Sequence, residues 1–213
     1  MELIPRFHQE FFVKKTIDKI KDNKDNKNKF LWGWKCRAGK TYGIGHLIDK
    51  YYNEFNSINA IIITPVPSET LSQFSNEMFK KFTNFRPLDI HEINKGTDLD
   101  KIRYTNKNNI IIISKQLLDN YVKSNNKNNF HKQVFDLVIF DENHFGGTTN
   151  NSKDILNLFD SNFTNQIFLT ATYQKTLNNF SIDEDCQFYW TIEDELYCKN
   201  RQINKLKIKH GED

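Results

Sequence analysis

Six short apolar runs set the pattern of this 213-residue chain, and they lie near residues 30–34, 60–64, 88–93, 109–113, 134–140 and 166–170. Short, continuous apolar runs of this kind predict buried β-strands. Segments with helical spacing lie between several of them, and such alternation predicts an α/β fold built on a parallel sheet with flanking helices. The pattern leaves the order of the strands open.

Three segments carry apolar residues at the spacing of a helix. Residues 7–20 predict an amphipathic helix. The segment 40–55 predicts a second helix, whose buried face holds Ile44, Leu47, Ile48, Tyr51 and Phe55. Ser68 can cap a third, whose buried face holds Leu71, Phe74, Met78 and Phe82. Gly43 and Gly45 each disfavour the second helix by about 1 kcal/mol relative to alanine, which indicates close packing or simple tolerance.

The string GWKCRAGKT, Gly33 to Thr41, joins the first predicted strand to the second predicted helix. Gly39 lets the backbone approach a phosphate group closely, and the loop amides with the helix N-terminus present donors to phosphate oxygens. Lys40 adds a positive charge suited to the β- and γ-phosphates, and the Thr41 hydroxyl can be offered to Mg²⁺. The string therefore predicts a phosphate-binding loop for ATP.

The loop departs from the usual G-x-x-x-x-G-K-[ST] pattern, because Trp34 stands at the first glycine position and Gly33 comes one residue too early. A chance AGKT at a loop-to-helix turn is the alternative. The nucleotide-contacting set expected within the loop is Cys36, Arg37, Ala38, Gly39, Lys40 and Thr41.

The string VIFDENHF, Val138 to Phe145, places two adjacent acids after another apolar run. Phosphoryl transfer to water needs one carboxylate for the Mg²⁺ shell and another to orient or deprotonate the water. These roles are assigned to Asp141 and Glu142. An ordinary Asp-Glu pair opening a loop is the alternative, but its co-occurrence with AGKT favours the catalytic interpretation.

The DENH string resembles the DExH box of superfamily-2 helicases and translocases, with His144 in the fourth position. This resemblance implies a RecA-like P-loop NTPase domain that hydrolyses ATP with Mg²⁺. The ordered motifs from Pro5 to Thr172 are most similar to the motor subunit of type III restriction enzymes and to related large-DNA-virus helicases.

The remaining motifs take their roles from the same resemblance. Residues 4–9, IPRFHQ, are similar to the adenine-reading segment, in which Arg6 and Gln9 are the expected contacts, since a glutamine amide can pair with both a donor and an acceptor on the base. Thr170 and Thr172 resemble the motif that couples hydrolysis to domain movement, with hydroxyls that can contact His144 or the acid loop.

Two further strand-to-loop segments resemble those that grip a nucleic-acid backbone. Their expected contacts are Thr64, Pro65, Ser114 and Gln116. A serine or threonine after a strand is more often a turn or a helix cap, so this assignment rests on the order of the motifs.

Length limits what the resemblance implies. The 213 residues, 38% of them apolar, predict a single domain, whereas superfamily-2 motors clamp ATP between two RecA-like domains. The tail after Thr172 is too short for another sheet. Residues 1–213 are therefore expected to form the first of two motor domains, excised or natural, and to be slow or inactive without the second domain or a partner subunit.

Charge and cysteine content change this picture little. The 30 basic and 27 acidic residues give a formal charge of +3, so a nucleic-acid site, for DNA more than RNA, must be a local patch. The Asn/Lys-rich segments 21–29 and 123–132 favour solvated loops over binding arms. Three cysteines without C-x-x-C spacing indicate neither a disulfide framework nor a zinc site. The lack of a long apolar run or signal region predicts an intracellular, cytoplasmic protein without membrane contact, in the host cytoplasm if viral.

Two classes of function remain open at this point. The first is the ATPase half of a helicase or translocase, with a DNA-packaging ATPase as its near neighbour. The second is a non-catalytic adaptor that binds nucleotide or nucleic acid and docks onto another protein. Both acids argue for the first class, because a binding module has no need of Asp141 and Glu142 together.

Overall fold

The computed structural model describes residues 1–22, 28–65, 73–97, 108–123, 134–141, 159 and 164–210. In chain order its elements are α1 (Phe7–Asp22), β1 (Lys29–Trp34), α2 (Lys40–Phe55), β2 (Asn59–Thr64), η1 (Gln73–Phe79), η2 (Thr83–Phe85), β3 (Asp89–Ile93), β4 (Asn109–Ser114), α4 (Lys115–Lys123), β5 (Leu137–Asp141), β6 (Asn165–Thr170), α6 (Gln174–Asn179), η5 (Glu184–Cys186), β7 (Gln187–Trp190) and α7 (Ile192–His210). The six predicted strands are all present.

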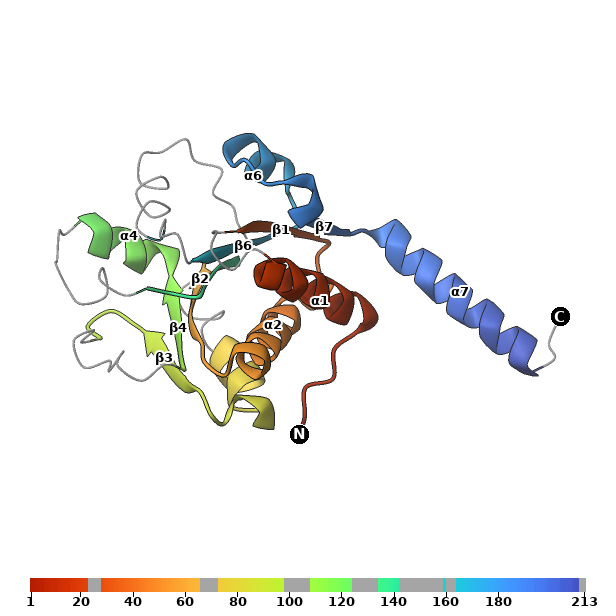
Figure 1. Cartoon of the computed structure of the whole chain (residues 1–213), viewed down its shortest axis with the longest axis horizontal. Helices are drawn as coiled ribbons and strands as arrows, with labels where there is room; N and C mark the ends of the chain where they lie inside the picture. Colours follow the sequence, from red (N-terminus) through yellow and green to blue (C-terminus); the bar gives the residue numbers. More distant parts are fainter. Residues whose placement is uncertain are drawn as a thin grey trace.

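The strands form one parallel sheet in the order β3-β4-β2-β5-β6-β1-β7 (Figure 1). The predicted α/β class is thereby confirmed. Because every strand runs in the same direction, the segments that follow them emerge at one edge of the sheet, where open α/β sheets bind ligands. Strand β6 lies between β1 and β5, so the two predicted motifs are separated by a single strand.

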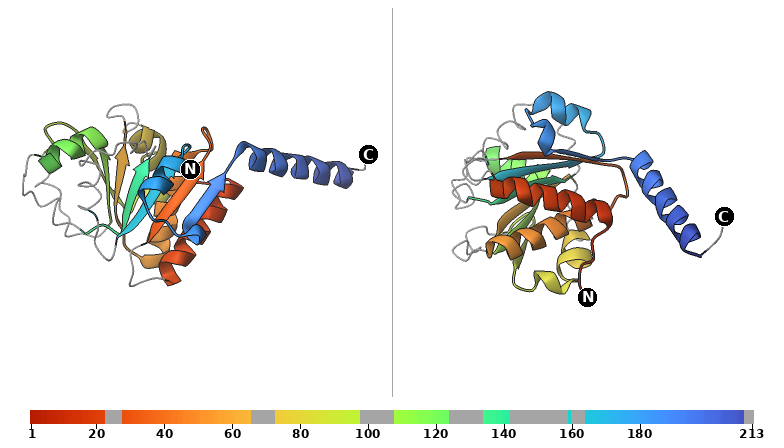
Figure 2. Two further views of the ribbon diagram at one scale, coloured as in Figure 1. Left: turned by 90° about the horizontal axis from the view of Figure 1, so that it is seen from above. Right: turned by 45° about the vertical axis from the view of Figure 1, so that its right-hand side comes forward.

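Helices cover both faces of the sheet (Figures 1 and 2). Helices α1 and α2 pack side by side on one face, and α6 lies over the other. The predicted inner face of α2 is buried at Ile44, Leu47, Ile48 and Tyr51, and Phe55 packs partly against the core. Helix α7 leaves the sheet at the β7 edge and projects away from the body.

Strand β5 begins three residues later than predicted, because Asp136 makes the hydrogen bonds that precede the regular pairing of the strand. The Asp136 carboxylate accepts a hydrogen bond from the Asn59 amide at 2.7 Å, while the Asp136 amide donates to the Asn59 carbonyl at 2.8 Å. Regular pairing of β5 with β2 then begins at Leu137 and Ala60.

The predicted third helix is a π-helical segment, η1, in its described part. Phe74 and Met78 on η1 and Phe82 after it are buried, which confirms that part of the predicted apolar face. Ser68 and Leu71, the expected cap and first member of that face, lie outside the described residues.

The sequence analysis predicted none of the elements in the tail after Thr172, of which β7 and α7 are the last two. Strand β7 adds an edge to the same sheet, with Phe188 and Trp190 buried and Gln187 and Tyr189 half-buried. Helix α7 starts with a capping box, in which the Thr191 hydroxyl accepts from the Asp194 amide at 3.2 Å and the Thr191 amide donates to the Asp194 carboxylate at 2.9 Å. Over the described residues, no helix has both the length and the apolar character of a membrane span.

Candidate active site

The predicted phosphate loop connects the end of β1 to the start of α2. Arg37 and Gly39 both have positive φ, 61° and 78°, so the loop turns tightly at these two residues. The first helical hydrogen bond of α2 runs from the Gly43 amide to the Gly39 carbonyl at 3.0 Å. The first amides of an α-helix have no acceptor within the helix, and Lys40 and Thr41 stand at this end. Amide donors, Lys40 and Thr41 are therefore together at the end of the loop where the sequence analysis expects the phosphates.

Trp34 can occupy the first glycine position of the loop motif because Gly43 of α2 lies against its ring and leaves space for it. Its indole ring is fully buried and stacks on Trp32 with a centroid separation of 4.8 Å. A Cβ atom on Gly43 would lie 2.5 Å from that ring, so the absence of a side chain at Gly43 makes the space. The early glycine, Gly33, has a separate packing role, since a Cβ there would lie 2.6 Å from the Tyr189 ring.

Two side chains of α1 support the loop from behind. The Gln9 amide donates to the Gly39 carbonyl at 2.9 Å, and its oxygen accepts from the Arg6 amide at 2.7 Å. His8 Nε2 lies 2.9 Å from the Ala38 carbonyl, and because a carbonyl only accepts, Nε2 carries the proton. Burial lowers the pKa of His8, and this hydrogen bond offsets only part of the effect.

Gln9 and His8 differ in how they relate to the sequence analysis. Gln9 is only 2% exposed and its amide bridges the adenine-reading segment to the loop, so its predicted contact with a base would use its remaining hydrogen-bonding positions. His8 was not predicted as a site residue. Its position beside Gln9 on the first turn of α1 was the only signal available in the sequence.

The tail holds the loop from the opposite side. The Lys35 amide donates to the Trp190 carbonyl at 3.0 Å, and the Lys35 ammonium lies 2.5 Å from the Glu195 carboxylate of α7. Hydrogen bonds from Lys199 and then Lys35 lower the pKa of Glu195 to about 2. Sequence analysis missed both contacts, because the two partners are far apart along the chain.

The acid motif and the coupling motif lie at the same edge of the sheet. Asp141 is the last residue of β5 and is 7% exposed; it pairs in register with Leu169 of β6. The next residue of β6, Thr170, pairs with Gly33 of β1. Neighbouring strands lie about 4.8 Å apart, so Asp141 sits about two strand spacings from the start of the phosphate loop.

The two threonines of the coupling motif contact each other. The Thr172 amide donates to Thr170 Oγ1 at 3.0 Å. The Thr170 side chain is fully buried, and Thr172 is exposed at the surface. The predicted general base Glu142 and the fourth motif residue His144 lie outside the described residues, as does any contact between His144 and these hydroxyls.

The four residues expected to grip nucleic acid divide into two buried and two exposed side chains. Thr64 and Ser114 pair directly across β2 and β4 and are nearly inaccessible, at 0% and 2% exposure. Ser114 Oγ accepts a hydrogen bond from the Leu117 amide at 3.3 Å, the geometry of a helix cap for α4. Pro65 and Gln116 follow them and are exposed at the same edge.

Comparison with protein families decides the affiliation of the chain. Residues 2–175 match the family model described as "Type III restriction enzyme, res subunit". The chain belongs to the res subunit family. The match spans both predicted motifs and ends before β7 and α7, so these two elements lie beyond the family model.

A relative of this res-family chain comes from Methanocaldococcus jannaschii and is described as the type I restriction enzyme MjaVIIIP endonuclease subunit. The two sequences are 37% identical over 82 residues, which is 36% of this chain and 8% of the relative. The chain therefore spans only a small part of the length of the relative that it matches.

Solved structures confirm the RecA-like helicase fold of the res-family chain. It is similar to the Sulfolobus solfataricus SWI2/SNF2 ATPase core in complex with dsDNA, with a TM-score of 0.57 and 16% identity over 81% of this chain and 34% of that one. It is also similar to the UvsW helicase of bacteriophage T4, with a TM-score of 0.54 and 17% identity over 87% of this chain and 60% of that one. The Pyrococcus furiosus Hef helicase domain is similar with a TM-score of 0.56 and 17% identity over 87% of this chain and 38% of that one.

Proposed function

We propose that this res-family domain is the ATP-binding and ATP-hydrolysing half of a DNA helicase or translocase. One observation carries the proposal: the Lys40 end of the phosphate loop and the nearly buried Asp141 carboxylate lie at the same edge of a parallel sheet. The strands that lead to them, β1 and β5, have only β6 between them. A carboxylate with so little exposure is retained where it has a partner or serves a site, and this edge is where open α/β sheets bind ligands.

Each group at this edge has a distinct role in the proposal. The loop amides and Lys40 bind the β- and γ-phosphates, where negative charge moves during transfer. Glu142 orients the attacking water and accepts its proton, and His144 links this acid loop to Thr170 and Thr172. Arg6 and Gln9 recognise adenine, while Cys36, Arg37 and Ala38 line the loop.

The side chains at this edge fit Mg²⁺. Thr41 supplies a hydroxyl at the helix start and Asp141 a carboxylate at the end of β5, and hard oxygen donors of this kind are those that Mg²⁺ prefers. When bound, the ion neutralises charge on the phosphate oxygens. Thr41 and Asp141 would hold it, largely through water.

DNA is the proposed polymer and a second RecA-like domain or partner subunit the proposed completion of the site. One structural relative was solved with dsDNA, and the sequence relative is described as a restriction enzyme subunit. Pro65 and Gln116, with Thr64 and Ser114 beneath them, form the proposed backbone contact. A second domain would supply arginines against the transition-state charge, and we propose that turnover is slow without them.

The test is steady-state ATP hydrolysis by the purified chain, alone and with single- and double-stranded DNA and RNA. Glu142→Gln, which retains shape but cannot accept the proton, is the control for contaminating activity. Turnover that DNA stimulates and that Glu142→Gln abolishes supports the proposal. ATP binding with no turnover, even after a second motor domain is supplied, would instead favour the non-catalytic adaptor.

A further inference from the structure

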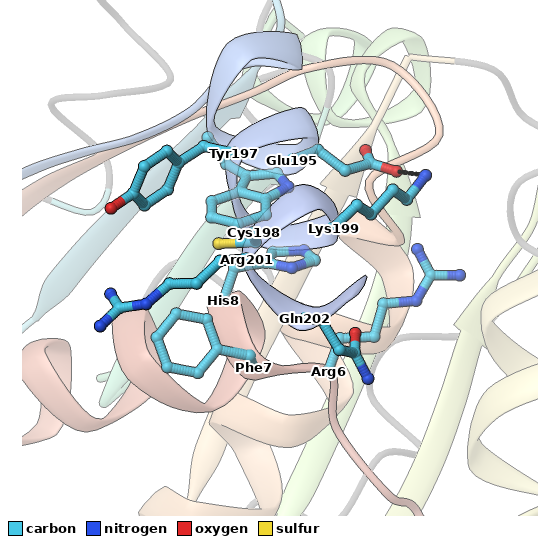
Figure 3. Close-up of a pocket in the computed structure, with 10 residues that line it drawn as sticks. Arg6, Phe7, His8, Glu195, Tyr197, Cys198, Lys199, Arg201 and Gln202 are labelled. Atoms are coloured by element: carbon cyan, nitrogen blue, oxygen red, sulfur yellow. Dashed lines mark ion pairs between the residues drawn. The ribbon is translucent and has the colours of Figure 1, made fainter. Parts of the chain in front are cut away.

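Helix α7 leaves the sheet at the β7 edge and projects from the body of the molecule (Figures 1 and 2). Its 19 residues, Ile192–His210, span about 28 Å at 1.5 Å per residue. Its first turns border a cavity of about 780 Å³ beside the start of α1, and Glu195, Cys198 and Gln202 are among the residues that line this cavity (Figure 3). The rest of its described surface is open to another molecule.

Three large apolar side chains form an exposed stripe along α7. Ile192, Leu196 and Ile203 are 60%, 53% and 50% exposed. Because successive helical residues turn by about 100°, the three lie within about 40° of one another around the helix axis. They do not line the cavity beside α1, so the α7 stripe faces a different direction. Helices in proteins gain most of their stability by packing an apolar face, and the described part of the chain provides no such packing for this one.

The charges of α7 are divided between its start and the rest of its length. The acidic residues all lie in the first turn: Glu193, Asp194 and Glu195. The lysines and the arginine all come later: Lys199, Arg201, Lys205, Lys207 and Lys209. The helix dipole favours such charges only in the first and last turns, so it does not account for basic residues that begin in the middle of the helix.

We propose that α7 is a self-association helix, whose stripe packs antiparallel against the stripe of a second copy of this chain. Antiparallel pairing sets the acidic start of each helix against the basic part of the other, and the two identical surfaces meet about a two-fold axis. It also places the two bodies at opposite ends of the pair, because α7 projects from the body. Parallel pairing would set acid against acid and bring both bodies to one end.

This contact goes beyond ATP hydrolysis, and it uses a helix that lies outside the residues 2–175 matched by the family. The apolar stripe supplies the affinity, and the charges set the orientation. A single pair of helices is a small interface, and interfaces below about 1,200 Å² in total are typical of weak, transient association. We therefore expect a reversible equilibrium between monomer and dimer.

Sedimentation equilibrium of the full 213-residue chain tests the pairing. Concentrations from about 2 to 200 μM cover the range in which a weak interface dissociates, and a reductant keeps the free cysteines from forming disulfides. Leu196→Ala and Ile203→Ala should each raise the Kd of the dimer at least about tenfold, because each removes buried apolar area twice in a two-fold pair. Alanine favours a helix, so α7 itself is retained.

The matched control is Tyr197→Ala. Tyr197 is 65% exposed on the same turn as Leu196, but it lines the cavity and lies off the stripe (Figure 3). This variant should dimerise as the wild type does. A wild-type chain that sediments as a monomer at every concentration would overturn the proposal, as would a dimer whose Kd is unchanged in Leu196→Ala and Ile203→Ala. Either result leaves the proposed ATPase function intact, because no residue of the phosphate loop takes part.

Charge reversal tests the antiparallel orientation. Glu193→Lys and Lys207→Glu should each raise the Kd of their own dimer at least about threefold, because each makes two attractive contacts repulsive. An equimolar mixture of the two variants should restore the wild-type affinity, since a basic helix then pairs with an acidic one. If Glu193→Lys alone dimerised as tightly as the wild type, antiparallel pairing would be refuted.

Discussion

Lys40 carries a positive charge in a position that is only 8% exposed, at the start of α2. Holding an ammonium group there costs solvation, which is recovered when negative charge is close by. Because the first amides of α2 also favour negative charge, this position is suited to binding an anion, and the size of the effect can be measured.

We expect Lys40→Ala to weaken ATP binding by at least about 2 kcal/mol, because it removes a nearly buried charge partner. This corresponds to roughly a thirtyfold rise in Kd. Titration with a fluorescent ATP analogue measures the change, and Lys50→Ala, at an exposed lysine of the same helix, is the control. Similar affinities for the two variants would contradict the assigned role of Lys40.

Gln9 makes a second residue-scale prediction. Gln9→Ala removes the bridge between the Arg6 amide and the Gly39 carbonyl, and it also removes the proposed contact with adenine. We expect the preference for ATP over GTP to fall, because the phosphate contacts remain while base recognition is lost. Competition binding with the two nucleotides measures this preference. An unchanged ratio would leave Gln9 with only a structural role.

Gly43 and Gly45 are neighbours on α2 and should respond differently to substitution. A Cβ on Gly43 would lie 2.5 Å from the buried Trp34 ring, whereas one on Gly45 would meet the flexible end of Met78. We expect Gly43→Ala to lower the free energy of unfolding by about 1–3 kcal/mol through overpacking. Gly45→Ala should be nearly neutral, because gained helix propensity offsets the contact. Urea denaturation of both variants tests the difference.

At the scale of elements, α1 and α2 are joined by a buried histidine. His46 is 3% exposed on α2, and its Nε2 lies 2.5 Å from the Glu10 carboxylate of α1. Burial lowers the pKa of His46 below its usual 6.5, and Glu10 offsets only part of that shift. His46 is thus held neutral and donates to Glu10 through Nε2.

This depressed pKa makes stability depend on pH. Below pH 6.5 the unfolded chain binds a proton at His46 more readily than the folded chain does, so stability falls as pH decreases until the folded pKa is passed. The slope for one such group is at most about 1.4 kcal/mol per pH unit. We expect His46→Gln to flatten the plot of unfolding free energy, measured by urea denaturation, against pH between about pH 7 and pH 5. Parallel curves for wild type and His46→Gln would contradict this.

Sequence reasoning succeeded where an element has its own periodicity. The apolar runs predicted β1 to β6, and the spacing of Ile44, Leu47 and Ile48 predicted the buried face of α2. It missed β7, a strand of only four residues whose one neighbour in the sheet, β1, is distant in sequence. The start of α7 did carry a signal, the T-x-x-D capping box at Thr191 to Asp194.

The candidate site shows the same division. Lys40, Thr41 and Asp141 belong to local strings, and these strings come to one edge because parallel strands bring them there. Glu195 and Trp190 reach the loop only through tertiary contacts, so spacing along the chain could not indicate them. Trp34 departs from the motif in the sequence. The space that Gly43 leaves for its ring is a three-dimensional contact, which the sequence could not indicate.

For the whole molecule, a formal charge of +3 predicts modest electrostatic attraction to DNA. If binding uses the edge around Pro65 and Gln116, about two to four phosphates should be neutralised, and the logarithm of the binding constant should fall with log salt with a slope of about −2 to −4. Fluorescence anisotropy over a salt series measures this slope. A slope steeper than about −6 would instead indicate that the Asn/Lys-rich segments 21–29 and 123–132 bind the backbone.

The three tryptophans of the chain are linked with His8 in one series of ring contacts. Trp32 stacks on Trp34, and Trp34 meets His8 edge-on. Trp190 stacks on His8, whose ring is hydrogen-bonded to the phosphate loop. Tryptophan fluorescence from this protein therefore originates beside the loop. The native chain carries its own optical reporter, in which a movement of His8 changes the quantum yield without any attached dye.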